Sequence, residues 1–285
     1  MDSFFELDIH KPRNVSEVLS KLSLPLHKLP NDEKELITII HSATADKVLK
    51  ILGLDELELI ENVKQTFTRD KIALVVWHAT NSIMWSYIKD KGLLPYNENE
   101  ILNIFRKEIS KIHEVGRSNK KWRQFLANTD YCNFYQCLRR KERPGIYFHV
   151  DCRIFEIEKE YVVGIIGPEG RISFYRDLID WSKKKNISVE KLILYLEDPE
   201  KHKGIILKCY LTPEILEEKW RQVARLVLEF AVAIKLGSYP STTFTLHRKL
   251  PKENIIPKFW VEGIIPLDMI NGKPIKIKFQ GIRFP

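Results

Sequence analysis

The apolar pattern of the chain changes at residue 71, and this change limits the folds that the sequence can adopt. Before it, apolar residues recur at helical spacing, as in Leu36-Ile37-Thr38-Ile39-Ile40. After it, Ile72-Ala73-Leu74-Val75-Val76-Trp77 is a short apolar run rich in β-branched residues, which is typical of a buried strand. We therefore predict an N-terminal helical module over residues 1–70 and a second domain over residues 71–285.

The N-terminal module is predicted to hold three short helices joined by tight turns. The first follows Asn31, a residue suited to an N-cap, and the second runs over Ala45–Leu52, where Gly53 can form a left-handed C-cap. The third is expected over Asp55–Phe67. Such helices are compatible with a helix-turn-helix module or with a helical cap packed on the second domain. No Lys/Arg cluster marks a recognition helix, so the sequence does not favour nucleic-acid reading by this segment.

The second domain is predicted to alternate strands and helices irregularly. Besides the run at residue 72, strands are expected over Ile146–Val150, Tyr161–Ile166, Ile205–Leu211, Phe259–Ile265 and Ile275–Phe279. Helices are expected over Ser82–Asp90 (with Gly92 as C-cap), Ile101–Arg143, Phe174–Lys184, Val189–Leu196 and Pro213–Leu236. This order argues for an α+β fold rather than for a repeating parallel β-α-β array.

The charge balance favours an anionic partner, because 46 Lys and Arg stand against 38 Asp and Glu, a net charge of +8. No apolar stretch approaches the roughly 18 residues of a membrane span, so we expect a soluble, cytoplasmic protein with no membrane partner. The four cysteines match neither a disulfide framework nor a paired zinc motif. We expect reduced thiols, with Cys209 buried in a strand, and no metal.

Three segments carry residues suited to a dinucleotide. His78 and Thr80 project from the same side of a strand end, where they can form hydrogen bonds with a ribose hydroxyl and with a carboxamide or phosphate. Tyr147, after a Pro-Gly turn, can stack on a planar ring such as nicotinamide. Glu262 can accept a ribose hydrogen bond or stabilise an oxocarbenium-like transition state. Each also has an ordinary structural interpretation: a strand-end histidine, a helix N-cap, a core tyrosine and a solvated glutamate.

The order of these segments resembles the ADP-ribosyltransferase superfamily, which includes the tRNA 2′-phosphotransferases. In that superfamily a strand ends in His-small-Thr and a helix leads to Gly-Leu, as in Val75–Thr80 through Gly92-Leu93. Gly145-Ile146-Tyr147-Phe148 is similar to its second motif, and Ile265-Pro266 through Ile270 to its Ile-Pro-x-x-x-Ile ending. The resemblance implies an ADP-ribosyltransferase-like split β-sheet core and NAD as the substrate. ADP-ribose would be transferred to a macromolecular acceptor such as DNA or RNA.

The resemblance also implies roles for single residues. His78 and the Ala79 backbone would orient NAD, Thr80 would support that site, and Tyr147 would stack on nicotinamide. In many relatives the catalytic Glu stands some eight positions before the Pro, where this chain has Lys258 and Phe259.

Two other glutamates are therefore candidates for the catalytic carboxylate, Glu262 and Glu253. The tRNA 2′-phosphotransferases lack this Glu, so an RNA 2′-phosphotransferase-like enzyme is an alternative. A further alternative is a non-enzymatic nucleic-acid-binding protein with a degraded NAD site.

A basic stretch lies between the His and Tyr motifs. It contains eight cations from position 117 to position 143, against two carboxylates: Arg117, Lys120, Lys121, Arg123, Arg139, Arg140, Lys141 and Arg143. Aromatic residues such as Trp122 and Phe125 are interleaved with them. The pattern suits a single-stranded nucleic acid, with phosphates on Lys/Arg and bases on rings, or a solvated helix whose aromatics face the core.

Overall fold

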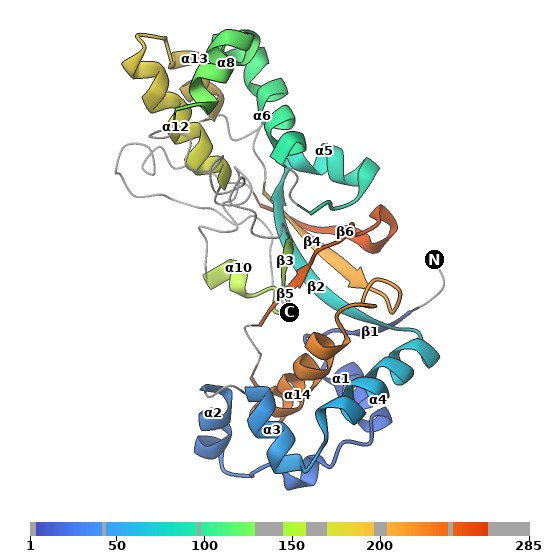
Figure 1. The fold of residues 1–285 in the computed structure, drawn as a ribbon. Helices are drawn as coiled ribbons and strands as arrows, with labels where there is room; N and C mark the ends of the chain where they lie inside the picture. The colour runs from blue at the N-terminus through green and yellow to red at the C-terminus, as the bar shows by residue number, and fades with distance from the viewer. Residues whose placement is uncertain are drawn as a thin grey trace.

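The fold is α+β, with a six-stranded sheet between two groups of helices (Figure 1). The computed structural model describes residues 4–41, 44–95, 98–128, 145–157, 170–196, 204–238 and 242–261. The sheet has the order β5-β3-β2-β4-β6, and β1 pairs parallel with the start of β2 while the other neighbours are antiparallel. Its strands are β1 (Phe5–Leu7), β2 (Ile72–Asn81), β3 (Ile146–His149), β4 (Gly204–Leu211), β5 (Thr243–Leu246) and β6 (Ile255–Val261).

The predicted N-terminal helices are present, preceded by one more. They are α1 (Pro12–Lys21), α2 (Glu33–His41), α3 (Thr44–Leu52) and α4 (Glu56–Arg69), with a 3-10 turn η1 (Leu26–Lys28) between the first two. Gly53 ends α3 with a φ of 68°. Asp55 caps α4 by accepting hydrogen bonds from the N–H groups of Leu57 and Glu58. At the start of α2 Asp32, not Asn31, accepts from the backbone, because its carboxylate reaches the N–H of Lys34.

These helices share one hydrophobic core with the sheet and with α14 (Trp220–Leu236). The ring of Phe67 in α4, fully buried, lies 5.8 Å from that of Trp220. Along β2, the even-numbered side chains from Ile72 to Val76 face this core. The division at residue 70 therefore does not separate two hydrophobic cores among the described residues.

A second core lies at the other end of the molecule, in a group of helices that we call the helical lobe (Figure 1). It consists of α6 (Glu98–Ile112), α7 (Glu114–Arg117), α8 (Asn119–Leu126), α12 (Gly170–Lys184) and α13 (Glu190–Leu196). Helix α5 (Ser82–Lys91) links the sheet to this lobe and ends at Gly92, which has the predicted positive φ, 81°.

Several element boundaries differ from the predictions. Strand β2 continues to Asn81 because β4 pairs with it along its whole second half. Helix α14 begins at Trp220, seven residues after Pro213. The strand expected from Phe259 begins at Ile255 in β6, and strands β1 and β5 were not predicted. The strands expected over residues 161–166 and 275–279 lie outside the described residues.

No helix among the described residues has both the length and the apolar composition that a membrane crossing requires.

Candidate functional site

The strands that carry the His and Tyr motifs are neighbours in the sheet. β2 and β3 pair antiparallel with Trp77 opposite His149, so Ala79 lies across from Tyr147 by continuation of this register. The His78 side chain reaches across the pair, and its Nδ1 lies 2.9 Å from the carbonyl oxygen of Tyr147. Two motifs almost seventy residues apart in the sequence therefore meet through a hydrogen bond between a side chain and the backbone.

The rings of His78 and Tyr147 nevertheless lie on opposite faces of the sheet. His78 contacts Phe148, with ring centroids 5.8 Å apart, and Phe148 belongs to the large core. Because side chains alternate along a strand, Tyr147 points to the other face, together with Trp77. The resemblance implied that His78 orients NAD while Tyr147 stacks on its nicotinamide, but the two rings do not face a common side of the sheet.

Burial controls the protonation of His78. Burial lowers the pKa of this imidazole, and the hydrogen bond with the Tyr147 carbonyl offsets that effect only in part. The ring is therefore neutral near pH 7. Since a carbonyl oxygen can only accept, Nδ1 carries the proton and donates it.

The other residues of the two motifs differ in exposure. Thr80 is buried on the His78 face and pairs with Ile205. It is not a helix N-cap, because the strand runs on to Asn81. The Tyr147 side chain is 57% exposed, so its ring is not a core side chain and is free to contact a ligand.

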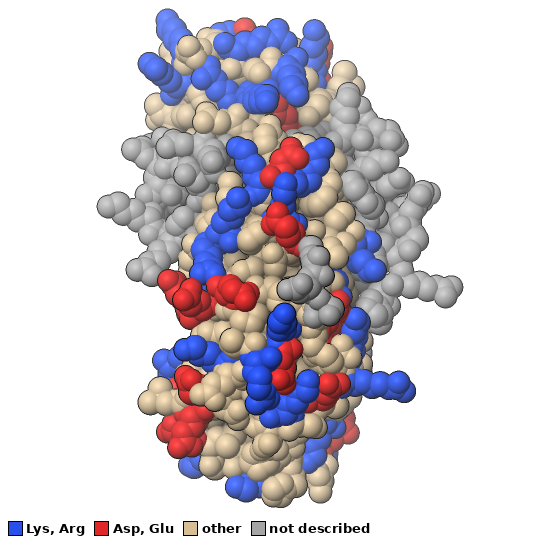
Figure 2. All heavy atoms as spheres, turned by 90° about the vertical axis from the view of Figure 1, so that its right-hand side faces the viewer, with Lys and Arg blue, Asp and Glu red and all other residues tan. Residues whose placement is uncertain are grey.

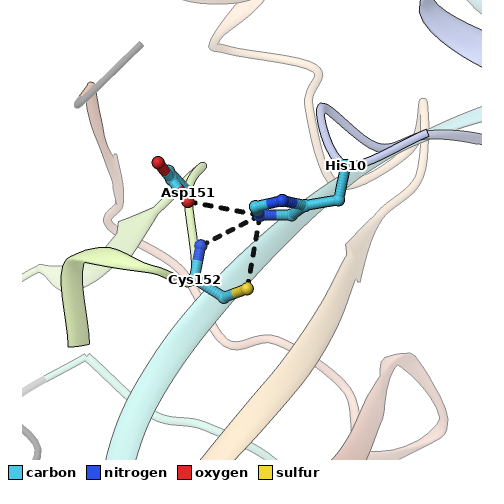
Figure 3. Close-up of side chains that lie close together, drawn as sticks. All are labelled: His10, Asp151 and Cys152. Atoms are coloured by element: carbon cyan, nitrogen blue, oxygen red, sulfur yellow. Dashed lines mark hydrogen bonds and ion pairs between the residues drawn. The ribbon is translucent and has the colours of Figure 1, made fainter. Parts of the chain in front are cut away.

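The face of the sheet that carries Tyr147 also holds a cluster that sequence analysis missed, which we call the His10 cluster (Figure 3). It consists of His10, in the turn after β1, and of Asp151 and Cys152, just after β3. The Nε2 atom of His10 lies 3.3 Å from Cys152 Sγ and 3.4 Å from Asp151 Oδ1. It also accepts the backbone N–H of Cys152 at 3.1 Å. The imidazole packs edge-on against Trp77, with 6.1 Å between ring centroids.

A network of charges adjoins the His10 cluster. Lys208 of β4 is buried, and its ammonium lies 3.0 Å from Glu6 and 3.2 Å from Asp8. Burial by itself would raise the pKa of Glu6, but hydrogen bonds from Lys11 and Lys208 outweigh it and lower this pKa to about 2. Burial by itself would lower the pKa of Lys208, but the carboxylates of Glu6 and Asp8 outweigh this effect and raise the pKa above its ordinary value. Glu6 and Lys208 are therefore both charged at neutral pH.

The His10 cluster is not a Cys-His-Asp catalytic triad. A triad uses one imidazole nitrogen for the nucleophile and the other for the carboxylate, whereas here Nε2 contacts both. The thiol is fully buried, and burial together with Asp151 and Asp8 raises the pKa of Cys152 to about 12. The cysteine is consequently neither accessible nor ionised as a nucleophile must be.

The sequence carried little signal for the His10 cluster. His10 stands in a segment without a motif, and Asp151 and Cys152 lie more than a hundred residues further on. Only the proximity of Asp151 and Cys152 to the Gly-Ile-Tyr-Phe motif could have drawn attention to them.

The predicted catalytic carboxylates are only partly described. Glu253 lies in the 3-10 turn η3 (Lys252–Asn254) before β6 and is exposed. Glu262 lies outside the described residues, directly after Val261, the last residue of β6.

The predicted nucleic-acid-binding residues lie in the helical lobe as far as they are described. Lys120 and Arg123 are exposed on α8, and Lys121 pairs with Glu114. Trp122 and Phe125 are buried in the core of the lobe, so they are not available for base stacking. The cations Arg139, Arg140, Lys141 and Arg143 lie outside the described residues.

The helical lobe concentrates the positive charge of the chain. Residues 98–128 and 170–196 contain thirteen Lys or Arg and seven Asp or Glu, a net charge of +6. Figure 2 shows Lys and Arg gathered over this end of the molecule. Lys183 and Lys184 lie in the last turn of α12, and Lys185 follows them directly.

Comparison of the chain with models of protein families, with curated proteins and with solved structures gives no match.

Proposed function

We propose that the chain is an NAD-dependent enzyme that transfers ADP-ribose to a macromolecular acceptor, with nucleic acid as the favoured acceptor class. One observation carries the proposal: the strands of the first two motifs and the strand that leads toward the third meet at one end of the sheet. Asn81 at the end of β2 pairs with Gly204, and Gly204 pairs with Val261 at the end of β6. On the other side of β2, Tyr147 lies across from Ala79. Nothing in the linear order of the motifs requires this convergence.

Tyr147 is the residue that we propose to hold nicotinamide. Its exposed ring can stack on the planar base, and the backbone of Ala79 lies beside it on the neighbouring strand. Stacking of aromatic rings contributes about 0.5–1.5 kcal/mol beyond the area that they bury. This is enough to orient a base but not to drive the reaction.

His78 then acts as a positioning residue rather than as a residue that contacts NAD. Its Nδ1–H donates a hydrogen bond to the carbonyl oxygen of Tyr147. This bond fixes the position of β3, the strand that carries the stacking ring. This role differs from the direct NAD contact that the resemblance implied.

The chemical step needs an anion beside the ribose, and we propose Glu262, with Glu253 as the second candidate. The C1′–N bond breaks, nicotinamide leaves with the electron pair, and the carboxylate stabilises the positive ribose. An oxygen or nitrogen of the acceptor then attacks C1′ and loses its proton to solvent.

Labelled NAD tests the proposal. The full chain is incubated with NAD labelled in its adenylate phosphate and, separately, with DNA, RNA and protein acceptors. We expect label on a nucleic acid. Release of phosphate from an RNA 2′-phosphate would support the phosphotransferase alternative, and absence of both transfer and NAD binding would contradict the proposal.

Matched variants locate the site. Tyr147→Ala should weaken NAD binding several-fold, Tyr147→Phe should retain it, and Tyr87→Ala on α5 serves as the control tyrosine. Glu262→Gln should lower the rate constant by about 100-fold, the usual scale for removal of one electrostatic contact in a transition state. Unchanged rates in both Glu262→Gln and Glu253→Gln would exclude these carboxylates.

Nucleic-acid binding by the helical lobe is a second candidate function, favoured by its net charge of +6. Charge reversal of Lys120 and Arg123 should weaken binding of single-stranded DNA or RNA and make the affinity less dependent on salt. Reversal of Lys34 and Lys50, exposed lysines of the N-terminal helices, is the control and should have little effect. Equal losses from both pairs would show that net charge alone accounts for the binding.

A further inference from the structure

We propose that the helical lobe binds the phosphate backbone of a nucleic-acid duplex in preference to a single strand. The inference rests on the nucleic-acid binding proposed above for this lobe and names the form of the ligand. It does not rest on the transfer of ADP-ribose, because the residues proposed for that reaction lie outside the lobe.

Cations concentrate at one end of the lobe, in residues 111–123 and 183–185, which we call the basic end. These two segments contain eight Lys or Arg and one Glu, a net charge of +7. The glutamate, Glu114, forms an ion pair with Lys121. Asp180 and Glu190 flank the second segment in the sequence, and the lobe as a whole still has a net charge of +6. The basic end therefore favours a polyanion.

Packing brings the two segments of the basic end together. The Nε2–H of His113, at the end of α6, donates to the carbonyl oxygen of Ser188, between α12 and α13, at 2.9 Å. Phe125 of α8 packs against Trp181 of α12, with 5.7 Å between ring centroids. The run that follows Trp181 therefore lies at the same end of the lobe as α7 and α8, where Figure 2 shows Lys and Arg gathered.

The kind of cation indicates contact with phosphates rather than with base edges. Six of the eight cations are lysines. Arg117 donates hydrogen bonds to the carbonyl oxygens of Ser110 and Lys111, at 2.8 Å and 3.2 Å, so it caps the end of α6. A lysine contacts phosphate as a point charge, whereas the planar fork of arginine recognises guanine. We therefore expect binding with little dependence on base sequence.

The aromatic residues of the lobe argue against a single strand as the preferred ligand. Trp122, Phe125 and Trp181 are at most 6% exposed and belong to the core of the lobe. No aromatic side chain that the structure describes in the lobe is exposed. Proteins that bind single strands stack the bases on exposed rings. A duplex keeps its bases stacked and presents about one charge per 1.7 Å of its axis, which suits an array of cations without rings.

An anionic membrane surface is a less suitable partner. A helix that binds such a surface buries an apolar face in the lipid. In the described part of the lobe, Leu194 is the one large apolar side chain that is exposed, at 66%. The apolar side of α8 is already buried against α12.

Binding of matched probes to the full chain tests the inference. Fluorescence anisotropy is measured with a DNA duplex, with the RNA duplex of the same sequence and with the separate strands, chosen without self-complementarity. We expect both duplexes to bind at least about tenfold more tightly than any of the strands. A duplex of unrelated sequence should bind with an affinity within a few-fold of the first.

Substitution of two exposed lysines locates the contact. Lys183→Gln combined with Lys185→Gln should weaken duplex binding. It should also reduce the slope of log affinity against log salt by about 2, because each lost phosphate contact removes roughly 0.9. Lys34→Gln combined with Lys50→Gln, exposed lysines of the N-terminal helices, is the control and should leave the slope unchanged.

The possible outcomes distinguish this inference from the proposal on which it rests. Single strands that bind as tightly as the duplexes, or more tightly, would overturn the preference for a duplex and leave nucleic-acid binding by the lobe intact. No binding of any probe would overturn both. A salt slope unchanged by the Lys183 and Lys185 substitutions would exclude the basic end as the site. Displacement of the duplex by phosphatidylserine vesicles of equal total charge would identify a membrane surface as the partner instead.

Discussion

Glu6 joins two lysines on the sheet face that carries Tyr147. Its carboxylate accepts from Lys208, from Lys11 and from the hydroxyl of Tyr210, while β1 itself is only three residues long. So short a strand has few backbone hydrogen bonds, and these side-chain contacts add to its attachment to the sheet. The hydrogen bonds from Lys11 and Lys208 hold the pKa of Glu6 at about 2, well below its usual value.

Glu6→Gln should therefore destabilise the protein in a pH-dependent way. Because the folded-state pKa is about 2 and the ordinary value is 4.5, the contribution of Glu6 is present above pH 4.5 and is lost as the pH falls toward 2. We expect a loss of about 2–3 kcal/mol in the free energy of unfolding at pH 7, measured by urea denaturation, and a smaller loss at pH 3.5.

The control for Glu6 is Glu17→Gln, an exposed residue paired with Lys21 on α1, which should change the stability by less than about 0.5 kcal/mol. A Glu6 effect that stays the same between pH 7 and pH 3.5 would show that the carboxylate charge is not its cause.

At the scale of the element, two helices end in the same way but in different surroundings. Gly92 after α5 and Gly237 after α14 have φ values of 81° and 60°. A Cβ at Gly92 would lie 2.2 Å from the carbonyl oxygen of Leu250, whereas a Cβ at Gly237 would meet nothing within 4 Å. The first glycine is thus required by its conformation and by a close approach, the second by its conformation alone.

Comparison of Gly92→Ala with Gly237→Ala should separate the free energy lost through the left-handed conformation from that lost through the close approach. The left-handed conformation costs an alanine about 1–2 kcal/mol, which is the loss expected at Gly237. Gly92→Ala should lose a further 1–3 kcal/mol or so from the clash with the backbone. Urea unfolding of the two variants measures the difference, and equal losses would contradict the close contact with Leu250.

At the scale of the whole molecule, the N-terminal helices complete the core of the sheet domain. Residues from α1 to α4 belong to the same cluster as α14 and as the inner faces of β2 and β4. Removal of these helices would expose a large apolar surface, which an isolated domain cannot leave in contact with water.

A chain that begins at Lys71 should therefore fail to fold cooperatively. Circular dichroism and thermal unfolding would show a broad transition or none. A single substitution that tests the same packing is Phe67→Ala. It should lower the free energy of unfolding by about 3–5 kcal/mol because the ring is fully buried.

Leu57→Ala on the same helix is the control for Phe67, since the leucine is 74% exposed and should contribute little. A soluble, sharply unfolding truncated chain would contradict the shared core.

Local signals in the sequence were sufficient for most helices. The helices α3, α4 and α12 lie close to where their apolar spacing and flanking residues predicted them, and Gly53 and Gly92 have the expected positive φ. The central strand was also predicted, with His78 and Thr80 at its end. Those residues are in a strand because β4 provides a partner for them, which no local pattern records.

The sequence by itself determined the class of the fold and the places where helices end, because both depend on interactions between residues a few positions apart. Tertiary structure alone decided that the rings of His78 and Tyr147 face opposite sides of the sheet, since that follows from the register between two strands. It also decided that His10 meets Cys152, a contact between positions 142 residues apart. Neither segment contains a signal for the other, so only the packing of the whole chain brings them together.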